Sequence, residues 1–217
     1  MIVVIDYGAG NLTSVRLAFE ELGAKVEITS SAERIRMAER VVFPGVGAAG
    51  AAMARIRDLA LERAIRETVA KGTPFLGICL GMQIVFEHSE EDGGVDLLGL
   101  IPGRVRRFTP RSPGEKVPHM GWNNVRQKRA HYLFRGIEDL SEFYFVHSYY
   151  PVPQDSRSVV AETEYAGVTF ASVVARSNLV ATQFHPEKSG RIGLRMLKNF
   201  LEWDGTDHAD QANNSLS

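Results

Sequence analysis

The chain has 217 residues, of which 44% are hydrophobic, and a formal net charge of −1 at pH 7. This size and apolar content suit one large globular domain with a substantial core. The near-neutral charge gives no electrostatic basis for binding nucleic acid or a membrane surface. No apolar run approaches the length of a membrane span, and residues 1–6 resemble a first strand more than a signal peptide. With a single cysteine, the composition predicts a protein of the reducing cytoplasm.

The first 88 residues alternate predicted strands and helices four times. Apolar runs predict strands at 2–5, 25–29, 40–43 and 74–78. Apolar residues at helical spacing predict helices from residue 11 or 13 to 22, after a capping box at 30–33, and over 50–59, 61–71 and 80–86. The pattern is typical of an open, mostly parallel sheet with helices on both faces, where functional groups gather at the carboxyl ends of strands.

The second half is predicted to extend this sheet with antiparallel strands. Strands are expected at 104–108, 143–149 and 179–184, with a hairpin formed by 159–164 and 168–175. The last helix, which begins at Ser189, is expected to bury Ile192, Met196, Leu197 and Phe200. His119 and Trp122 are interpreted as core residues. Residues 1–203 are predicted to form a single domain, and the polar segment 204–217 a disordered tail.

Residues 77–81 have the sequence of a nucleophile elbow, with cysteine in the place of serine. A sharp strand-to-helix turn strains the backbone of the central residue, and flanking glycines let the two elements approach closely. A buried structural cysteine would not need glycines on both sides. We therefore predict that Cys79 is a nucleophile at the start of a helix, where the helix dipole and free N–H groups favour the thiolate.

Two glycine-rich loops follow other strands. Residues 7–11 are more simply a tight strand-to-helix turn than a phosphate-binding loop, because the rest of that fingerprint is absent. Residues 44–47 allow two interpretations, which the spacing alone does not separate. They are either another turn or a loop that presents backbone N–H groups to an oxyanion beside the nucleophile.

A thiolate nucleophile requires a base and a group that orients the base. His185 and Glu187 follow the last predicted strand, and residues two apart in an extended segment share a side. A carboxylate bound to one imidazole nitrogen leaves the other nitrogen free to accept the thiol proton. An isolated His-x-Glu is usually a surface turn, but here it lies at a strand end, as Cys79 does. The remaining histidines show no metal-ligand spacing, so we predict neither a metal nor a cofactor.

These motifs resemble the class I (triad) glutamine amidotransferases. The resemblance is carried by residues 77–83, by Pro44-Gly-Val-Gly47 and by 184–189. Pro118-His-Met-Gly-Trp-Asn123 and residues 145–149 make the chain similar to the glutaminase subunits of imidazole glycerol phosphate synthase, in histidine biosynthesis. The resemblance extends to about residue 203 and implies a flavodoxin-like α/β fold, with an open mixed sheet flanked by helices.

The resemblance implies a role for each motif. Cys79 would attack the side-chain amide of glutamine, His185 would move the proton, and Glu187 would hold His185. The oxyanion would be bound by the backbone N–H of Leu80 and by one from the strand Gly45–Gly47. The head groups of glutamine would be held by Gln83 and by the main chain at Ser148 and Tyr149. Hydrolysis of a γ-glutamyl thioester would release glutamate.

The resemblance also implies a partner. Ammonia would pass to a cyclase subunit with a (βα)₈ barrel, in a heterodimer. There it would react with a phosphoribulosyl formimino carboxamide ribonucleotide, yielding imidazole glycerol phosphate and an aminoimidazole carboxamide ribonucleotide. The family's docking face corresponds here to Asn11, Met120, Trp122, Tyr144 and Lys188. The oxyanion strand of the family would need the liganded partner to align, and a peptide flip there is easy for glycine.

Three alternatives stay open from the sequence. The chain could be the glutaminase of another pathway, such as pyridoxal phosphate, guanine nucleotide or anthranilate synthesis, although those families do not share residues 118–123 in this form. It could be a free-standing cysteine hydrolase or peptidase, which would not prefer glutamine. It could also be a non-catalytic interaction module, in which Cys79 would be dispensable.

Overall fold

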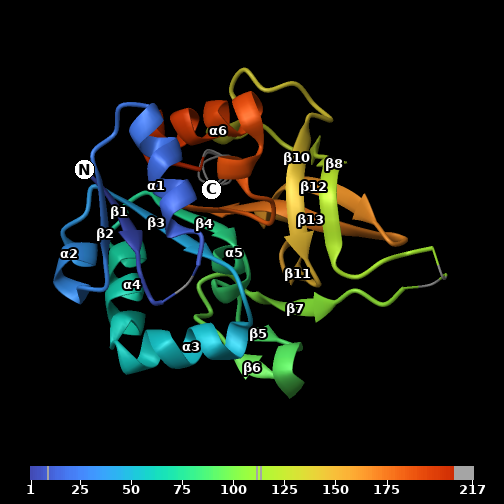
Figure 1. Cartoon of the computed structure of the whole chain (residues 1–217), viewed down its shortest axis with the longest axis horizontal. Coiled ribbons are helices and arrows are strands. Elements are labelled where there is room, and N and C mark those ends of the chain that lie inside the picture. Colours follow the sequence, from blue (N-terminus) through green and yellow to red (C-terminus); the bar gives the residue numbers. More distant parts are fainter. Residues whose placement is uncertain (9, 111, 113, 208–217) are drawn as a thin grey trace, which may run out of the picture.

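The computed structural model describes residues 1–8, 10–110, 112 and 114–207, and its centre is an eight-stranded sheet (Figure 1). In spatial order its strands are β2 (Val26–Thr29), β1 (Ile2–Ile5), β3 (Arg40–Gly45), β4 (Phe75–Cys79), β14 (Leu179–Thr182), β13 (Val168–Arg176), β12 (Val159–Tyr165) and β9 (Arg126–Gln127). The strands from β2 to β14 are parallel, and those from β14 to β9 are antiparallel. The predicted mixed, mostly parallel sheet with an antiparallel extension is confirmed.

Helices cover both faces of the parallel part. They are α1 (Leu12–Glu21), α2 (Ala32–Arg36), α3 (Ala49–Asp58), α4 (Leu61–Ala70), α5 (Leu80–Ile84) and α6 (Gly190–Glu202). Ile2 and Val4 of β1 join an apolar cluster with α1 and α6, whereas Val3 and Ile5 join a second cluster with α3 and α4. Successive strand residues point to opposite faces, so a strand that is apolar throughout requires cover on both sides. Figure 1 shows the two helical layers above and below the sheet.

Two smaller sheets extend the second half of the chain. One pairs β10 (Glu142–His147) with β8 (His119–Asn124). The other contains β11 (Tyr149–Pro153), β7 (Gly103–Arg107), β5 (His88–Ser89) and β6 (Val95–Asp96). Short 3₁₀ helices occur along the connecting segments, namely η1 (Glu91–Gly93), η2 (Tyr132–Phe134), η3 (Ser156–Ser158) and η4 (Pro186–Lys188). The predicted strand 143–149 is therefore two strands, and the chain passes from one small sheet to the other at Ser148.

Several predicted boundaries shift in the structure. Ser31, and not Ser30, caps α2 by accepting a hydrogen bond from the N–H of Arg34. Helix α5 ends at Ile84 instead of residue 86, because the carbonyls of Val85 and Phe86 accept hydrogen bonds from N–H groups at residues 99–101. This end of the helix is set by a segment distant in sequence, which local periodicity does not report.

Two residues predicted to be buried are exposed. Trp122 is 55% exposed, because the β8–β10 sheet packs only one face on the core, and that face carries His119. Ile192 is 36% exposed, because the buried stripe of α6 starts at Gly193 and continues through Met196, Leu197 and Phe200. A Cβ on Gly193 would lie 1.9 Å from the carbonyl oxygen of Pro186, so the helix approaches the fold most closely there.

The segment after Trp203 packs against the domain further than predicted. The indole N–H of Trp203 donates to the carbonyl of Thr206 over 2.9 Å. The Asp207 carboxylate receives two hydrogen bonds from Arg129, of 2.6 and 2.8 Å, and Asp207 is only 5% exposed. Residues 204–207 thus belong to the packed part of the chain, and the remainder of the predicted tail, 208–217, lies outside the described residues.

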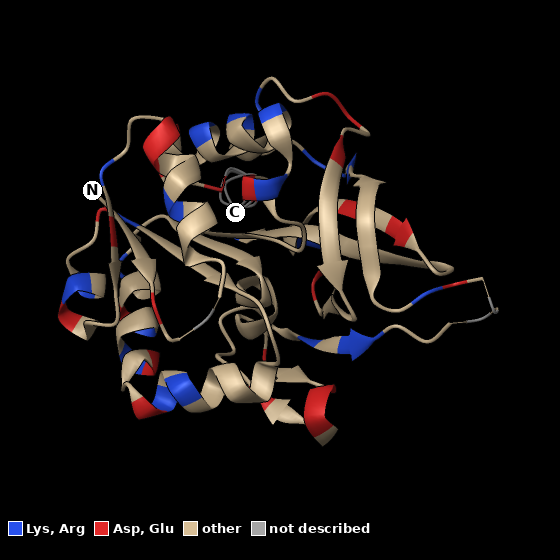
Figure 2. Cartoon of the chain, in the orientation of Figure 1, with Lys and Arg blue, Asp and Glu red and all other residues tan. Residues whose placement is uncertain are grey.

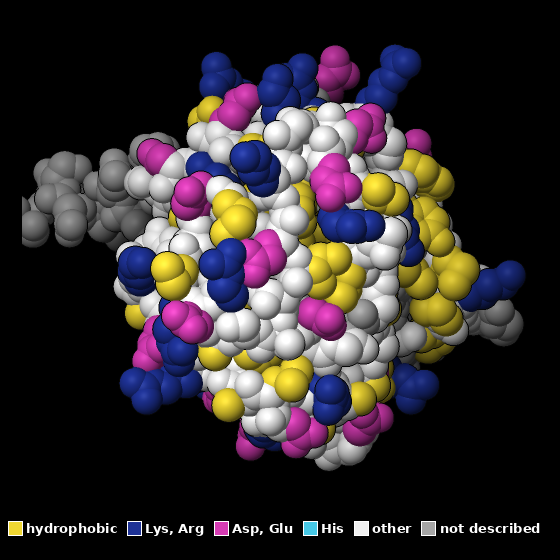
Figure 3. Space-filling view, turned by 60° about the vertical axis from the view of Figure 1, so that its left-hand side comes forward, with side chains coloured by type: hydrophobic (Ala, Val, Ile, Leu, Met, Phe, Trp, Pro, Cys, Tyr) yellow, Lys and Arg dark blue, Asp and Glu magenta, His cyan; other side chains and the backbone are white. Residues whose placement is uncertain are grey.

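Charged residues are concentrated on the helices and loops around the sheet (Figure 2). On the face shown in Figure 3, basic and acidic side chains are interspersed, so this face does not have the extended field of one sign that favours nucleic acid. Among the described helices, none combines the length and the apolar character needed to cross a membrane.

Candidate active site

Cys79 is both the last residue of β4 and the N-terminal cap of α5. Its backbone has φ 53° and ψ −106°, a left-handed φ that non-glycine residues adopt rarely. Strain of this kind costs on the order of 1–3 kcal/mol and is concentrated at functional sites. The strained strand-to-helix turn predicted from the sequence is confirmed.

The glycines on either side of Cys79 are required by close backbone contacts. A Cβ on Gly77 would lie 2.8 Å from the carbonyl oxygen of Gly81. A Cβ on Gly81 would lie only 1.8 Å from the carbonyl oxygen of Phe43 in β3. The turn therefore packs against its own backbone and against the neighbouring strand, and a side chain at either position would push them apart.

His185 and Glu187 reach the same edge of the sheet. Strand β14 pairs in parallel with β4, so the residue that follows each strand lies at a common end. His185 Nδ1 lies 2.7 Å from Glu187 Oε1, and the two side chains are 1% and 0% exposed. The same carboxylate oxygen accepts a hydrogen bond of 2.6 Å from the side-chain amide of Asn11. A buried carboxylate that makes two hydrogen bonds holds the His185 ring in one orientation, as the predicted pair requires.

The charges around His185 favour its protonated form. Burial alone would lower its pKa, because a charged ring loses hydration. The nearby charge of Cys79 and a side-chain interaction with it, together with the carboxylate of Glu187, outweigh burial and raise the pKa of His185 to about 10. His185 Nε2 is buried and has no hydrogen-bond partner of good geometry within the described residues. Its interaction with the sulfur is therefore mainly electrostatic. An imidazolium at His185 is therefore stabilised by the carboxylate of Glu187 and by a negative charge on the sulfur.

A cavity of about 330 Å³ opens onto Cys79. Five of the predicted oxyanion and substrate residues line it, namely Gly47, Leu80, Gln83, Ser148 and Tyr149. Gly45 does not line it but pairs with Cys79 in the register of β3 and β4. This volume is at the lower end of the range for small-molecule sites, and it suits an amino acid.

Three polar groups at this site were not expected from the sequence. Glu91 lines the cavity and accepts a hydrogen bond of 2.6 Å from the N–H of Ala49, while burial raises the pKa of its carboxyl. Tyr7 follows β1, is 2% exposed, and its hydroxyl has no hydrogen-bond partner in the described chain. Gln183 is fully buried and donates to Cys79 Sγ over 3.7 Å. The only sequence signal for Gln183 was a polar residue inside an apolar strand.

Two buried histidines form a directed hydrogen-bond chain beside the cavity. His147 Nδ1 lies 2.7 Å from the carbonyl oxygen of Tyr149, which only accepts, so Nδ1 carries the proton. His147 Nε2 must then accept from His119 Nδ1 over 2.9 Å, and His119 Nε2 accepts from Asn123 over 3.2 Å. Burial lowers the pKa of His147 to about 3 and that of His119 to about 4. Both rings are thus neutral, and they fix the main chain that lines the cavity at residues 148–149.

The five predicted docking residues lie on neighbouring elements. Met120 and Trp122 are 63% and 55% exposed on β8, and the Trp122 and Tyr144 rings are 6.1 Å apart across the β8–β10 pair. The carbonyl of Tyr144 accepts a hydrogen bond from the N–H of His185, three residues before the exposed Lys188. The remaining residue, Asn11, contacts Glu187 directly. The docking surface predicted from the sequence would thus adjoin the active site.

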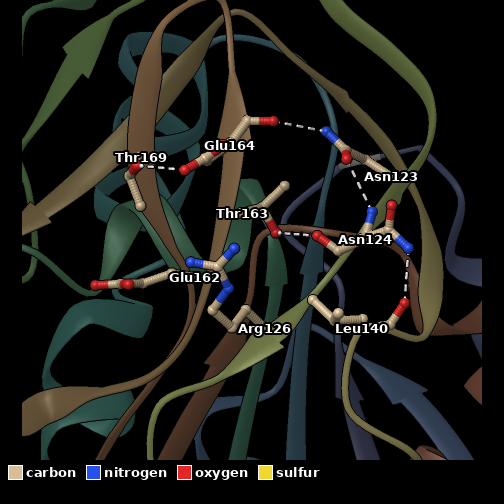
Figure 4. Close-up of a pocket in the computed structure, with 8 residues that line it drawn as sticks. All are labelled: Asn123, Asn124, Arg126, Leu140, Glu162, Thr163, Glu164 and Thr169. Atoms are coloured by element: carbon tan, nitrogen blue, oxygen red, sulfur yellow. Dashed lines mark hydrogen bonds between the residues drawn. The ribbon is translucent and has the colours of Figure 1, made fainter.

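A second cavity, of about 390 Å³, lies against β8, β9 and β12 (Figure 4). Its polar groups are largely paired with one another. Asn123 donates to the carbonyl of Glu164 over 3.0 Å, Asn124 to that of Leu140 over 2.7 Å, and Thr163 to that of Asn124 over 3.0 Å. Such pairing points to a structural role. Among the described residues, no group of three or more His, Cys, Asp or Glu side chains is placed to hold a metal ion.

Comparisons with known proteins agree with this geometry. The profile of the family described as Glutamine amidotransferase class-I matches residues 3–203. Imidazole glycerol phosphate synthase subunit HisH of Nitrosococcus oceani is 52% identical over 206 residues, which are 94% of this chain and 98% of that relative. The subunit of the same name from Moorella thermoacetica is 52% identical over 201 residues, covering 93% of this chain and 94% of the relative.

Solved structures support the fold. A crystal structure of a glutamine amidotransferase has a TM-score of 0.69 at 20% identity, covering 95% of this chain and all of the other. A chain of PurLQS from Thermotoga maritima has a TM-score of 0.69 at 17% identity, covering 93% and 97%. Together with the family match and the identity to the HisH relatives, these findings show that the chain belongs to the class-I glutamine amidotransferases, among the HisH subunits of imidazole glycerol phosphate synthase.

Proposed function

We propose that this chain hydrolyses glutamine to glutamate at Cys79 and delivers the ammonia to a cyclase subunit of imidazole glycerol phosphate synthase. The observation that carries the proposal is a strained cysteine at the mouth of a cavity, beside a buried His185–Glu187 pair. The relatives that are 52% identical bear the name of that synthase subunit, which supports the pathway. The single domain is proposed to end between residues 203 and 207. The protein is proposed to work in the reducing cytoplasm.

In the first half of the reaction, the Cys79 thiolate attacks the side-chain carbonyl carbon of glutamine. A C–S bond forms and the carbonyl electrons move to oxygen, where the N–H of Leu80 and one N–H of the segment Gly45–Gly47 stabilise the negative charge. The intermediate then collapses as the C–N bond breaks. His185 gives its Nε2 proton to the leaving nitrogen, so ammonia departs and a γ-glutamyl thioester remains.

In the second half, water attacks the thioester. His185, now neutral, accepts a proton from the water as the C–O bond forms. The C–S bond breaks, the thiolate returns, and glutamate is released. Glu187 keeps a proton on the Nδ1 of His185 throughout, so that Nε2 is the atom that donates and accepts the transferred proton. The balance is one glutamine and one water consumed for one glutamate and one ammonia.

The cavity provides complementary groups for the amino-acid head of glutamine. The side-chain N–H of Gln83 donates to the carbonyl of Tyr149 over 3.0 Å, which leaves the side-chain oxygen of Gln83 as an acceptor. Glu91 supplies a partly buried carboxylate on the cavity wall, suited to the α-ammonium group. The main chain at Ser148 and Tyr149 lines the same wall and is suited to the α-carboxylate. Glutamate release should therefore be selective for an unblocked amino acid.

The partner is proposed to be a (βα)₈ barrel that docks on Asn11, Met120, Trp122, Tyr144 and Lys188. Two large exposed apolar side chains beside the active site favour a protein partner there. The oxyanion segment contains Gly47 at φ 103°, where a change of peptide orientation is inexpensive. A partner that binds one orientation better would shift the population toward it, and glutamine would in turn strengthen partner binding.

The test is to measure glutamate release by the chain alone, and then with the cyclase and its nucleotide ligand. We expect very low activity alone and a rise of several orders of magnitude in the complex. Equal activity without a partner would contradict the proposal and favour a free-standing hydrolase. Loss of activity in Cys79→Ala with unchanged cyclase binding would exclude a non-catalytic interaction module.

A further inference from the structure

We infer that Gln183 is a further catalytic residue, whose side-chain amide stabilises the thiolate of Cys79. Its Nε2 lies 3.7 Å from Sγ, within the range of a hydrogen bond to sulfur, and its side chain is fully buried. A buried N–H donor favours a charged acceptor over a neutral one, so it favours ionisation of the thiol. This inference rests on the proposed glutaminase function and deepens it.

The orientation of the Gln183 amide follows from its neighbours. The carbonyl oxygen of Tyr149 can only accept, so the end of Gln83 that lies 3.0 Å from it must be the NH₂ group. The second hydrogen of that NH₂ points to the Gln183 amide over 3.2 Å, so Gln183 must present its oxygen there. The nitrogen of Gln183 consequently faces the sulfur. The Tyr149 carbonyl itself is held by the neutral His147.

The thiol and the thiolate have different partners. As a thiol, Cys79 can donate a hydrogen bond to the carbonyl of Val146 over 3.8 Å, but this oxygen cannot stabilise a negative sulfur. As a thiolate, the sulfur has passed its proton to His185 and accepts from Gln183. Helix α5 has only five residues, so its dipole is a weak source of stabilisation. The amide of Gln183 is therefore the main neutral donor that the structure provides to the sulfur through a side chain.

Because Cys79 is the only cysteine in the chain, its alkylation reports on this one sulfur. The titratable groups around it are Tyr7 after β1, Glu91 in η1, His147 at the end of β10, and His185 with Glu187 beyond β14. Substitution of Gln183 leaves all five in place. In a variant that adds no titratable group, such as Gln183→Met, a change in the pH profile of alkylation then reflects the lost donor.

The experiment measures the rate of iodoacetamide alkylation against pH in the full chain. Gln183→Met removes the donor and keeps the length, and Gln183→Glu keeps the shape but replaces the donor with a carboxylate. We expect the midpoint of the profile to rise by about one pH unit in Gln183→Met and further in Gln183→Glu, with alkylation near neutral pH slower by about tenfold. The matched control is Ser172→Ala, a fully buried residue of β13 whose carbonyl accepts the Gln183 backbone N–H. It should keep the wild-type profile.

Folded Gln183→Met and Gln183→Glu variants with the wild-type midpoint would overturn the inference. If neither variant folds, the side-chain amide resonances of Gln183 in the wild-type protein decide by NMR. They should titrate together with alkylation and stop titrating in Cys79→Ala, and resonances that do not respond to pH would overturn it. Glutamine turnover in the cyclase complex is measured separately, so a failure of the proposed function would be recognised by a wild-type protein that alkylates normally and does not release glutamate.

Discussion

The side-chain amide of Asn11 donates a hydrogen bond of 2.6 Å to Glu187 Oε1, the same oxygen that contacts His185. Asn11 has a left-handed backbone, with φ 70°, in the loop that precedes α1. A residue of the predicted docking surface thus contacts the acid of the predicted triad. A partner that moved this loop would change the support of His185 without touching the cysteine.

Asn11→Gly tests this contact, because glycine tolerates the left-handed backbone and removes only the donor. The loss of a hydrogen bond to a charged group costs on the order of 1.5 kcal/mol, so kcat in the complex should fall about tenfold. In Asn11→Asp, kcat should fall further, because this substitution places a second carboxylate against Glu187. Thr13→Ala, at an exposed position in the first turn of α1, serves as the control. Unchanged kcat in both Asn11 variants would show that this bond does not support catalysis.

Gly45 and Tyr7 should be coupled in stability. A Cβ on Gly45 would lie 2.1 Å from the Tyr7 hydroxyl and 3.0 Å from Leu80 Cβ, so Gly45→Ala should lower the free energy of unfolding by about 1–3 kcal/mol. Tyr7→Phe removes a buried hydroxyl that lacks a partner in the described chain and should be neutral or stabilising. In the double variant, Tyr7→Phe should recover part of the loss, as urea unfolding would measure. Strictly additive effects would mean that the hydroxyl is not what fills the space beside Gly45.

The neutral histidines predict acid sensitivity. In the folded state the pKa values of His119 and His147 are lowered by burial from 6.5 to about 4 and about 3, so the unfolded chain binds more protons below pH 6.5. Their contribution is fully present above that pH and is lost as the pH falls toward about 4, by about 2 kcal/mol or more in total. His185 affects the free energy of unfolding in the opposite direction, because its pKa is raised to about 10. Its contribution to stability is lost as the pH rises through that value.

The two effects together place maximum stability near pH 6.5. Urea unfolding at about pH 5, pH 6.5 and pH 9 would measure this. The alkaline loss should be smaller in Cys79→Ala, which removes the largest charge that raises the pKa of His185 but leaves Glu187 in place. A free energy of unfolding that is constant from about pH 5 to pH 7 would contradict the neutral assignment of the His119–His147 chain.

Met120 and Met37 form a matched pair for testing the docking surface. They are 63% and 66% exposed, but Met120 lies on β8 next to the active site and Met37 follows α2. Met120→Ala should weaken cyclase binding by about tenfold or more, as expected for an apolar contact near the centre of an interface. Met37→Ala should leave binding unchanged. Titration calorimetry with the cyclase measures both, and equal affinities for the two variants would place the interface elsewhere.

The sequence was sufficient to predict elements whose signals are local. Apolar runs gave the parallel strands, and glycines around Cys79 gave the turn, because each depends on neighbouring residues. The partners of Gln183 and Glu91 were not predictable in this way. Gln183 reaches the sulfur only because β14 lies beside β4. Glu91 reaches the cavity from a segment whose hydrophobic pattern predicts neither a helix nor a strand. Trp122 was misassigned because burial on β8 depends on which face of a two-stranded sheet meets the core.

Covalent catalysis by Cys79 is tested most directly by looking for the acylated sulfur. The complex with liganded cyclase is mixed with glutamine, quenched in acid within one turnover, and digested for mass spectrometry. We expect a γ-glutamyl adduct on the peptide that contains Cys79. In Cys79→Ala, both the adduct and glutamate release should be absent. Glutamate release that persists in Cys79→Ala would contradict it.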